Sequence, residues 1–325
     1  MPRLCLGWAA LGAVALAACT DTQSPDESAS TPSAPSGTSL PVMESIELTT
    51  PLANAVAGFQ IDLRFVNAPT PAQEQFFRAA AARWESIITG DVPDADGLIP
   101  ARSCGNSFRT PSLQGPFDDL VIHVLLQPID GPGAVLGAAG ACLVRNEDLL
   151  PLYGLMFFDT DDLATIEQAG VLDEVIVHEM GHVLGIGTIW ERKELLLGAG
   201  GDNPTFMGTN AVREYGALRG GDAVPVPVEN MGNAGTRDVH WREFIFLTEL
   251  MTGRIAGPNN PISRMTVASL QDLGYVVDMN AAEPYALPNL FALAEEGLLT
   301  PHNAPIDHGI VLPTIPTVLR ESSLR

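Results

Sequence analysis

Apolar and polar residues alternate from Phe59 to Phe65, which is the pattern of a strand with one buried face. The runs 120–126 and 154–158 are apolar almost throughout, and they predict two further strands that are buried. The chain should therefore contain a sheet whose strands are spread over about one hundred residues of sequence.

Two other stretches show helical spacing. Thr70, Pro71 and Gln73 form a capping-box pattern with proline at the first helical position, and the periodic apolar residues that follow stop at Gly90. The stretch 171–185 is apolar around much of its circumference and predicts a buried helix. A strand, a helix, further strands and a second helix, in this order, predict an α+β domain.

The composition supports a folded and acidic protein. The 325 residues are 46% apolar and 17% charged, which allows a sizeable core. There are 39 acidic residues and only 17 basic ones, so the net charge is −22. Such a surface repels phosphate backbones, and we exclude a nucleic-acid partner on this ground.

The N-terminus has the pattern of an export signal. Arg3 precedes the apolar run 4–18, which is too short to span a bilayer comfortably. The run ends in Leu-Ala-Ala before Cys19, which resembles the lipobox of bacterial lipoproteins. This resemblance implies a signal peptide over 1–18 and a lipid on Cys19. The alternative is an ordinary signal in which Cys19 is incidental.

A low-complexity segment follows the predicted lipid site. Of the 22 residues 20–41, 14 are Ser, Thr or Pro, so the segment has almost nothing to bury. We expect a flexible tether over 19–57 that holds the folded body at the bacterial cell envelope, on the outer membrane or cell surface. Contact with the membrane would be through the lipid only.

Two cysteines remain for the folded body. Cys5 leaves with the signal and Cys19 is the proposed lipid site, so Cys104 and Cys142 are left as one pair. An exported protein with one pair most simply joins it as a disulfide. The alternative is a zinc-binding or nucleophilic thiol, but neither cysteine has a C-x-x-C partner or a histidine beside it.

The predicted buried helix carries the sequence H-E-x-x-H. His178 and His182 are four residues apart, so both imidazoles project from one face and can reach one zinc ion at ~2.0–2.1 Å. Glu179 follows the first histidine, where its carboxylate contacts a zinc-bound water instead of the metal. The helix therefore predicts two metal ligands and a general base.

A catalytic zinc site needs a third protein ligand. Gly185 stands where H-E-x-x-H-x-x-G-x-x-H has its glycine, but the last histidine of that pattern is replaced by Thr188. Two possibilities remain. One is a glutamate on a following helix, as in gluzincins, with three candidates: Glu191, Glu194 and Glu214. The other is a histidine delivered after an inserted loop.

The segment 235–243 contains His240, followed at once by Trp241. The segment 248–253, with the sequence TELMTG, comes shortly afterwards and contains Met251. At these residues the chain resembles leishmanolysin, a metzincin in which a long insertion displaces the third histidine. The stretches 226–230 and 266–275 also resemble this family, and the resemblance covers roughly 59–290.

The resemblance implies a role for each matching residue. His178, His182 and His240 would bind one catalytic zinc ion, Glu179 would be the base, and Met251 would form the methionine turn beneath the metal. The implied fold is a metzincin-type zincin domain over 58–290, with a twisted mixed sheet, an active-site helix, an inserted loop before the third ligand and a C-terminal helix. The remainder, 291–325, is expected to be a tail.

The implied activity is that of a zinc metalloendopeptidase acting on proteins or peptides, and we expect a monomer. The chain departs from the protozoan enzyme in having few cysteines, and we expect neither a cysteine-bearing propeptide nor a separate C-terminal domain. Two alternatives stay open: a gluzincin-like peptidase with a glutamate ligand, and a tethered adhesin or binding lipoprotein whose zinc is not catalytic.

Overall fold

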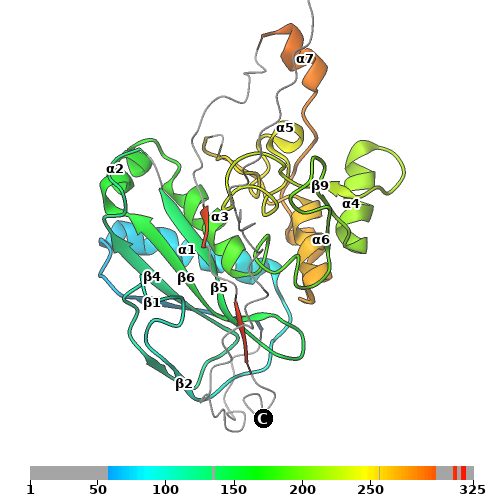
Figure 1. The fold of residues 1–325 in the computed structure, drawn as a ribbon. Coiled ribbons are helices and arrows are strands. Elements are labelled where there is room, and N and C mark those ends of the chain that lie inside the picture. The colour runs from blue at the N-terminus through cyan, green and yellow to red at the C-terminus, as the bar shows by residue number, and fades with distance from the viewer. Residues whose placement is uncertain (1–57, 134–135, 256, 298–309, 313–315, 320–325) are drawn as a thin grey trace, which may run out of the picture. The chain divides into compact units, whose positions relative to one another are not determined.

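The computed structural model describes residues 58–133, 136–255, 257–297, 310–312 and 316–319 (Figure 1). The predicted signal segment 1–18, the lipid site Cys19 and the tether 19–57 lie outside these ranges. The described elements, in chain order, are β1 (Ile61–Phe65), α1 (Pro71–Ile87), β2 (Leu98–Ile99), β3 (Leu113–Gln114), β4 (Leu120–Gln127), β5 (Gly137–Val144), β6 (Pro151–Asp159), α2 (Thr160–Gln168), α3 (Leu172–Val183), β7 (Leu196–Leu197), β8 (Thr205–Phe206), α4 (Thr209–Arg219), β9 (Val226–Pro227), α5 (Glu243–Phe246), α6 (Arg264–Leu273), a 3₁₀ turn (Met279–Ala281), α7 (Leu290–Glu295), β10 (Ile310–Val311) and β11 (Thr317–Val318).

A mixed sheet with the strand order β1-β4-β6-β5 lies at the centre of the fold. β1, β4 and β6 are parallel, whereas β5 is antiparallel to β6. The outer edge of β5 pairs with the short strands β10 and β11, both parallel to it. The α+β prediction is confirmed, and the strands expected at 59–65, 120–126 and 154–158 correspond to β1, β4 and β6. The described parts of 291–325, the expected tail, thus contribute strands to the sheet.

The sheet has a core on each face. In β4, Leu120 and Ile122 belong to the core that contains α1 and α3, whereas Val121 and Leu125 belong to the core on the opposite face. The second core includes the disulfide between Cys104 and Cys142, with an S–S distance of 2.01 Å. The bridge ties the loop before β3 to β5.

α1 begins with the predicted capping box. Thr70 Oγ1 accepts a hydrogen bond from the Gln73 amide at 3.2 Å, and Gln73 Oε1 accepts one from the Thr70 amide at 3.0 Å. The buried face of α1 packs against α3, where the Trp84 indole donates to the Val177 carbonyl at 2.9 Å. α1 therefore holds the helix that carries the two histidines.

Strand β5 has no hydrophobic pattern that predicts it. Its sequence, GAAGACLV, consists mostly of small residues with weak strand preference, yet the whole strand is buried. Small residues are needed because α3 packs closely on this part of the sheet. A β-carbon at Gly154 in β6 would collide with the Val183 side chain and the Gly140 carbonyl. The end of α3 is thereby set directly against β5 and β6.

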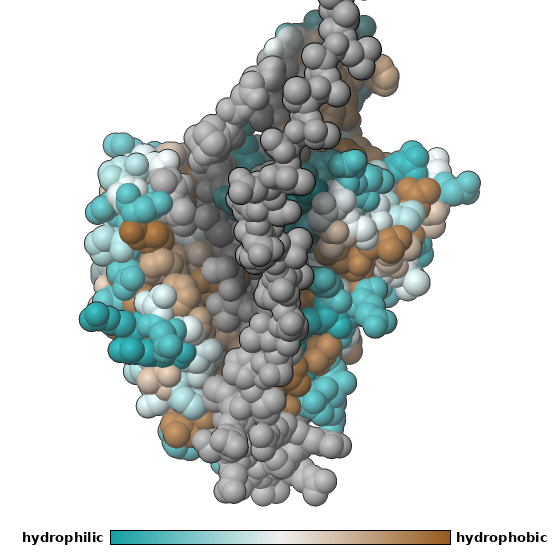
Figure 2. Space-filling model, viewed as in Figure 1, coloured by the Kyte–Doolittle hydropathy of each residue, from teal (hydrophilic) through white to brown (hydrophobic). Residues whose placement is uncertain are grey.

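The described surface is mainly hydrophilic. Figure 2 shows apolar side chains in small separate groups on the face that it presents. Within the described ranges, no helix has the length and apolar composition needed to cross a membrane. The large apolar side chains that are exposed are Leu98, Leu197, Met207, Met231, Phe244, Val276 and Phe291.

Candidate metal centre

The two helical histidines lie on α3, which is buried along nearly its whole length. Asp173 and Glu174 occupy its first turn, where the helix dipole favours negative charge. His178 and His182 are 2% and 0% exposed and lie one turn apart. The helix therefore places two buried imidazoles side by side.

The turn after α3 orients the second histidine. The chain leaves the helix at Gly185, which has φ +110°, a conformation that favours glycine. This turn places the Ile186 carbonyl 2.8 Å from Nδ1 of His182. A carbonyl oxygen only accepts, so Nδ1 of His182 donates and its Nε2 carries the lone pair.

His240 arrives from the irregular chain between β9 and α5. Its carbonyl accepts from the Glu229 amide at 2.8 Å, and the Trp241 amide donates to the Met251 carbonyl at 2.9 Å. Trp241 is fully buried against Trp190, with ring centroids 4.7 Å apart. These contacts fix the third histidine between the segments 226–229 and 250–252.

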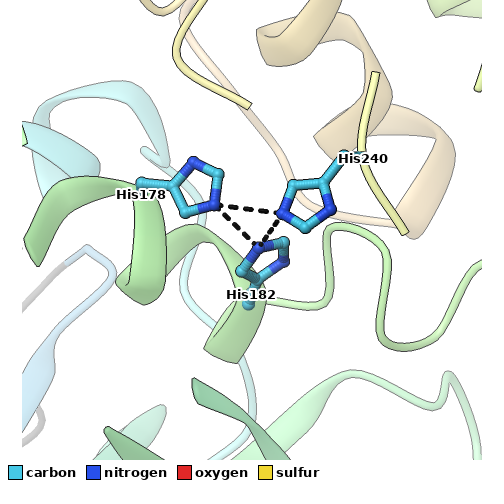
Figure 3. A group of neighbouring side chains, drawn as sticks. All are labelled: His178, His182 and His240. Atoms are coloured by element: carbon cyan, nitrogen blue, oxygen red, sulfur yellow. Dashed lines mark hydrogen bonds between the residues drawn. The ribbon is translucent and has the colours of Figure 1, made fainter. Parts of the chain in front are cut away.

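The three histidines form a closed triangle (Figure 3). Their Nε2 atoms lie 3.0 Å apart for His178 and His182, 3.0 Å for His182 and His240, and 3.2 Å for His178 and His240. Nδ1 of His178 faces the Leu250 carbonyl at 2.7 Å, and Nδ1 of His240 faces the Thr236 carbonyl at 2.9 Å. Each Nδ1 therefore carries the proton, and all three Nε2 lone pairs point toward the centre of the triangle.

This arrangement fits a zinc ion. Points 3.0–3.2 Å apart can all lie ~2.0–2.1 Å from one common point, the usual zinc–nitrogen distance. Burial, together with the neighbouring rings of His240 and His178, lowers the pKa of His182 well below its ordinary 6.5. A neutral imidazole is the form that binds a metal, so the site keeps this ligand ready to bind.

Glu179 is completely buried beside these ligands. Neither of its carboxylate oxygens has a hydrogen-bond partner among the described residues. Burial raises the pKa of Glu179 well above its ordinary 4.5. A buried carboxyl group without partners is costly, and a cation at the histidine triangle would reduce that cost by favouring its charged form.

Met251 lies against α3 between the two histidines of the helix. A β-carbon at Gly181 would be 2.8 Å from Met251 Sδ, so the close approach depends on the glycine. The preceding residue, Leu250, supplies the carbonyl that accepts from His178. The turn that contains Met251 thus supports the metal centre in two ways: its side chain packs against α3, and the carbonyl before it orients His178.

Two buried acids that the sequence analysis did not single out hold this arrangement in place. The Glu249 carboxylate accepts from the Met251 and Ser263 amides, at 2.7 and 3.1 Å, and from the hydroxyls of Ser263 and Thr266. Thr266 Oγ1 in turn accepts from the Trp241 indole at 2.8 Å. An acid two residues before Met251, in an apolar segment, was the available signal for Glu249.

The second acid is Glu229. Its carboxylate accepts from the amides of Asn230 and Met231 at 2.9 Å and of Glu243 at 2.8 Å, while its own amide donates to the His240 carbonyl. It is 2% exposed. No spacing rule marks this residue, because its role depends on contacts between segments that are distant in sequence.

The three glutamates that were candidate ligands lie elsewhere. Glu191 and Glu194 are exposed, and Glu214 forms an ion pair with Arg264 at 3.0 Å. Within the described ranges, His240 is the residue that joins His178 and His182 in a cluster of three possible metal ligands. The structure thus places the third imidazole, and none of these carboxylates, beside the two helical histidines.

These features define an α+β domain with a buried three-histidine metal centre and an adjacent carboxylate. Residues 103–291, more than half of the chain, match the model of the leishmanolysin family. The chain belongs to this family, which is one of zinc metallopeptidases. A comparison with curated proteins found no match.

Proposed function

We propose that this protein is a zinc-dependent endopeptidase in which His178, His182 and His240 hold one zinc ion and Glu179 is the general base. The observation that carries the proposal is the triangle of inward-facing Nε2 atoms beside a buried carboxyl group that has no hydrogen-bond partner among the described residues. A purely structural zinc normally has four protein ligands, whereas a catalytic zinc has three and one open position.

Zinc held by these imidazoles supplies Lewis-acid chemistry, which makes water a nucleophile at neutral pH and polarises a peptide carbonyl. Glu179 takes a proton from the attacking water onto its carboxylate and later delivers a proton to the departing amine. A cation at the histidine triangle would favour the charged form of Glu179, which is the form that accepts this proton.

The finer family features belong to the same proposal. We assign the domain 58–290 to the metzincin type, with Met251 as its turn methionine. The chain from the end of α3 to His240 would be the inserted loop, and α6 the C-terminal helix. The contact of Met251 with Gly181 supports this assignment because it places a soft apolar side chain directly beneath the ligand-bearing helix.

We further propose an exported enzyme that is held at the bacterial envelope by a lipid on Cys19 and acts as a monomer on protein substrates. The lipobox-like residues 16–19 and the Ser/Thr/Pro-rich stretch 20–41 support this placement. Mass spectrometry of the intact protein isolated from membranes tests it. A mature chain that retains residues 1–18, or that lacks the mass of the lipid, would contradict the proposal.

The central test is Glu179→Gln, which keeps the size of the side chain and removes the base. We expect full zinc content by elemental analysis and a roughly 10²–10⁴-fold loss in the rate of casein cleavage. Glu194→Gln, at an exposed position, is the matched control and should cleave like the wild type. Cleavage by Glu179→Gln at the wild-type rate would disprove the general-base role.

The same preparation decides between the enzyme and a tethered adhesin or binding lipoprotein. A wild-type protein with one bound zinc ion per chain should cleave members of a broad peptide library, and a zinc chelator should abolish the cleavage. Zinc-loaded protein that cleaves no peptide in the library would favour the adhesin.

A further inference from the structure

The edge strand nearest the metal centre is covered by the C-terminal part of the chain. β10 pairs with β5 in the register Ile310–Ala138 and Val311–Ala139, and β11 pairs in the register Thr317–Leu143 and Val318–Val144. The residue after each strand adds a further hydrogen bond. The Leu312 amide donates to Ala139 at 2.8 Å and the Leu319 amide to Val144 at 2.9 Å. We call β10 with Leu312 and β11 with Leu319 the C-terminal strands.

Burial also holds the C-terminal strands in place. Leu312 and Leu319 are 3% and 2% exposed and belong to the same core as Cys142 and Leu143 of β5. The contact is short, however, since each strand pairs over two residues only. Short ladders at the edge of a sheet are among the elements that open most readily.

The covered edge leads directly to the metal centre. A β-carbon on Gly140 would lie 3.5 Å from Leu312 Cβ and 3.5 Å from Thr188 Cγ2, so both side chains lie near this residue of β5. Thr188 Oγ1 donates to the His182 carbonyl at 2.8 Å. Gly140 and Thr188 therefore lie between Leu312 and the backbone of the zinc ligand His182.

An extended peptide binds a sheet edge through the strand's amide and carbonyl groups, whichever direction it runs. The C-terminal strands use the groups of Ala139 and Val144 for their own pairing. A second extended chain cannot bind those groups at the same time. Occupation of this edge by the C-terminal strands and by another peptide is therefore mutually exclusive.

We propose that the chain's own C-terminal strands act as an intramolecular inhibitor, because they occupy the outer edge of β5 and exclude extended polypeptide from it. This inference rests on the proposed peptidase function. An unfolded substrate gains access to the full edge only when the C-terminal strands leave it. The apparent affinity for such a substrate is reduced by the fraction of molecules in which the edge is open.

Backbone substitutions in the zinc-loaded full-length chain test the inhibition. Leu312→Pro and Leu319→Pro each remove one amide donor to β5 without altering β5 itself. We expect the double variant to raise kcat/KM on casein roughly tenfold, mainly through KM, with unchanged zinc content. Phe291→Ala, which removes an exposed apolar side chain from α7, is the control and should leave kcat/KM unchanged.

A binding measurement separates this inference from the peptidase proposal. A fluorescent synthetic peptide with the sequence of residues 310–319 should bind the double-proline variant and not the wild type, as followed by anisotropy. If neither the wild type nor the variants cleave casein, the proposed peptidase function is wrong. The anisotropy measurement still decides whether the edge of β5 binds a peptide. Leu312→Ala with Leu319→Ala keeps both amide donors and should give a smaller change in the same direction.

Two results would overturn the inference. One is a folded, zinc-loaded proline variant whose kcat/KM on casein equals that of an active wild type. The other is equal binding of the synthetic peptide to the wild type and to the variants, or binding to none of them. If the proline variant does not fold, the paired alanine variant is subject to the same two criteria.

Discussion

The sulfur of Met251 lies against Gly181, the residue immediately before the second histidine of α3. A β-carbon at Gly181 would be 2.8 Å from this sulfur and 3.1 Å from the Trp84 ring on α1. The helix can approach both neighbours only because position 181 has no side chain. The contact also links α3 to the Leu250 carbonyl, which fixes the His178 ring.

Replacing Gly181 with alanine should therefore lower both the stability of the fold and the affinity of the metal centre for zinc. The added methyl group displaces Met251 or Trp84, and overpacking of this kind costs about 1–3 kcal/mol of unfolding free energy. Movement of the Leu250 carbonyl should reduce zinc affinity by roughly 10–100-fold. Chelator competition and urea unfolding measure the two effects. The control is Gly221→Ala, where a β-carbon meets no atom within 4 Å; equal zinc affinity in the two variants would refute the prediction.

Glu249→Gln should loosen the support of the third histidine. Glutamine has only one acceptor oxygen. This oxygen can accept either from the Met251 amide or from Ser263 and Thr266, but not from both sides as the carboxylate does. One unsatisfied buried group costs about 1–3 kcal/mol. We expect a lower melting temperature and weaker zinc retention, measured by calorimetry and dialysis. Glu191→Gln, at an exposed position, is the comparison and should change neither quantity.

Removal of His240 should abolish the stabilisation that zinc gives to the fold. Zinc binds the folded chain and raises its melting temperature in proportion to the logarithm of free zinc over the dissociation constant. A chelator should lower the melting temperature of the wild type and leave that of His240→Ala unchanged. His123→Ala removes a buried histidine that contacts Tyr153 in the sheet. That variant should be less stable yet still respond to the chelator, and a chelator response in His240→Ala would contradict the assignment of this ligand.

Glu243 predicts part of the pH dependence of stability. Burial is the main cause that raises the pKa of Glu243 from 4.5 to about 7. A hydrogen bond from Thr252 and the charge and backbone amide of Arg254 lower this pKa, whereas the negative charge of Glu229 raises it further. A carboxyl group with a raised pKa in the folded state stabilises the fold below pH 4.5, and this contribution is lost as the pH rises through about 7.

Glu243→Gln should therefore remove a decline in unfolding free energy between about pH 4.5 and pH 7, on the order of 1–3 kcal/mol. Urea titrations of the zinc-loaded wild type and variant across this range measure it. Above pH 8 the two proteins should show parallel pH dependence. A variant that declines as steeply as the wild type between pH 5 and 7 would show that Glu243 is not responsible.

The part of the site that is local in sequence could be predicted from the sequence. Four-residue spacing on a helix puts His178 and His182 on one face whatever the rest of the fold does. The capping box at Thr70 and the buried strand β4 depend likewise on neighbouring residues, and both are present in the structure. His240 could be found only through its resemblance to a family pattern, because no local rule connects it with the helix.

What the sequence did not reveal depends on long-range contacts. The first six residues of β5, GAAGAC, include none of the β-branched and aromatic residues typical of strands, and α3 packs closely on this part of the sheet. The carboxylates of Glu249 and Glu229 each accept from one amide that is 14 residues away, Ser263 and Glu243 respectively, and no spacing rule predicts these contacts. The residues of the expected tail that pair with β5 gave no signal either, since a strand of two residues has no measurable period.

The carbonyls of Ile186, Thr236 and Leu250, which hold the three imidazole rings, come from three separate stretches of backbone. The rings are ordered by folding and not by the ion, so little entropy is lost when zinc enters. Rings that are held in this way stay in place when zinc leaves and are ready to bind it again. Protein stripped of its metal by a chelator should therefore recover its zinc content as soon as zinc is added back, without refolding.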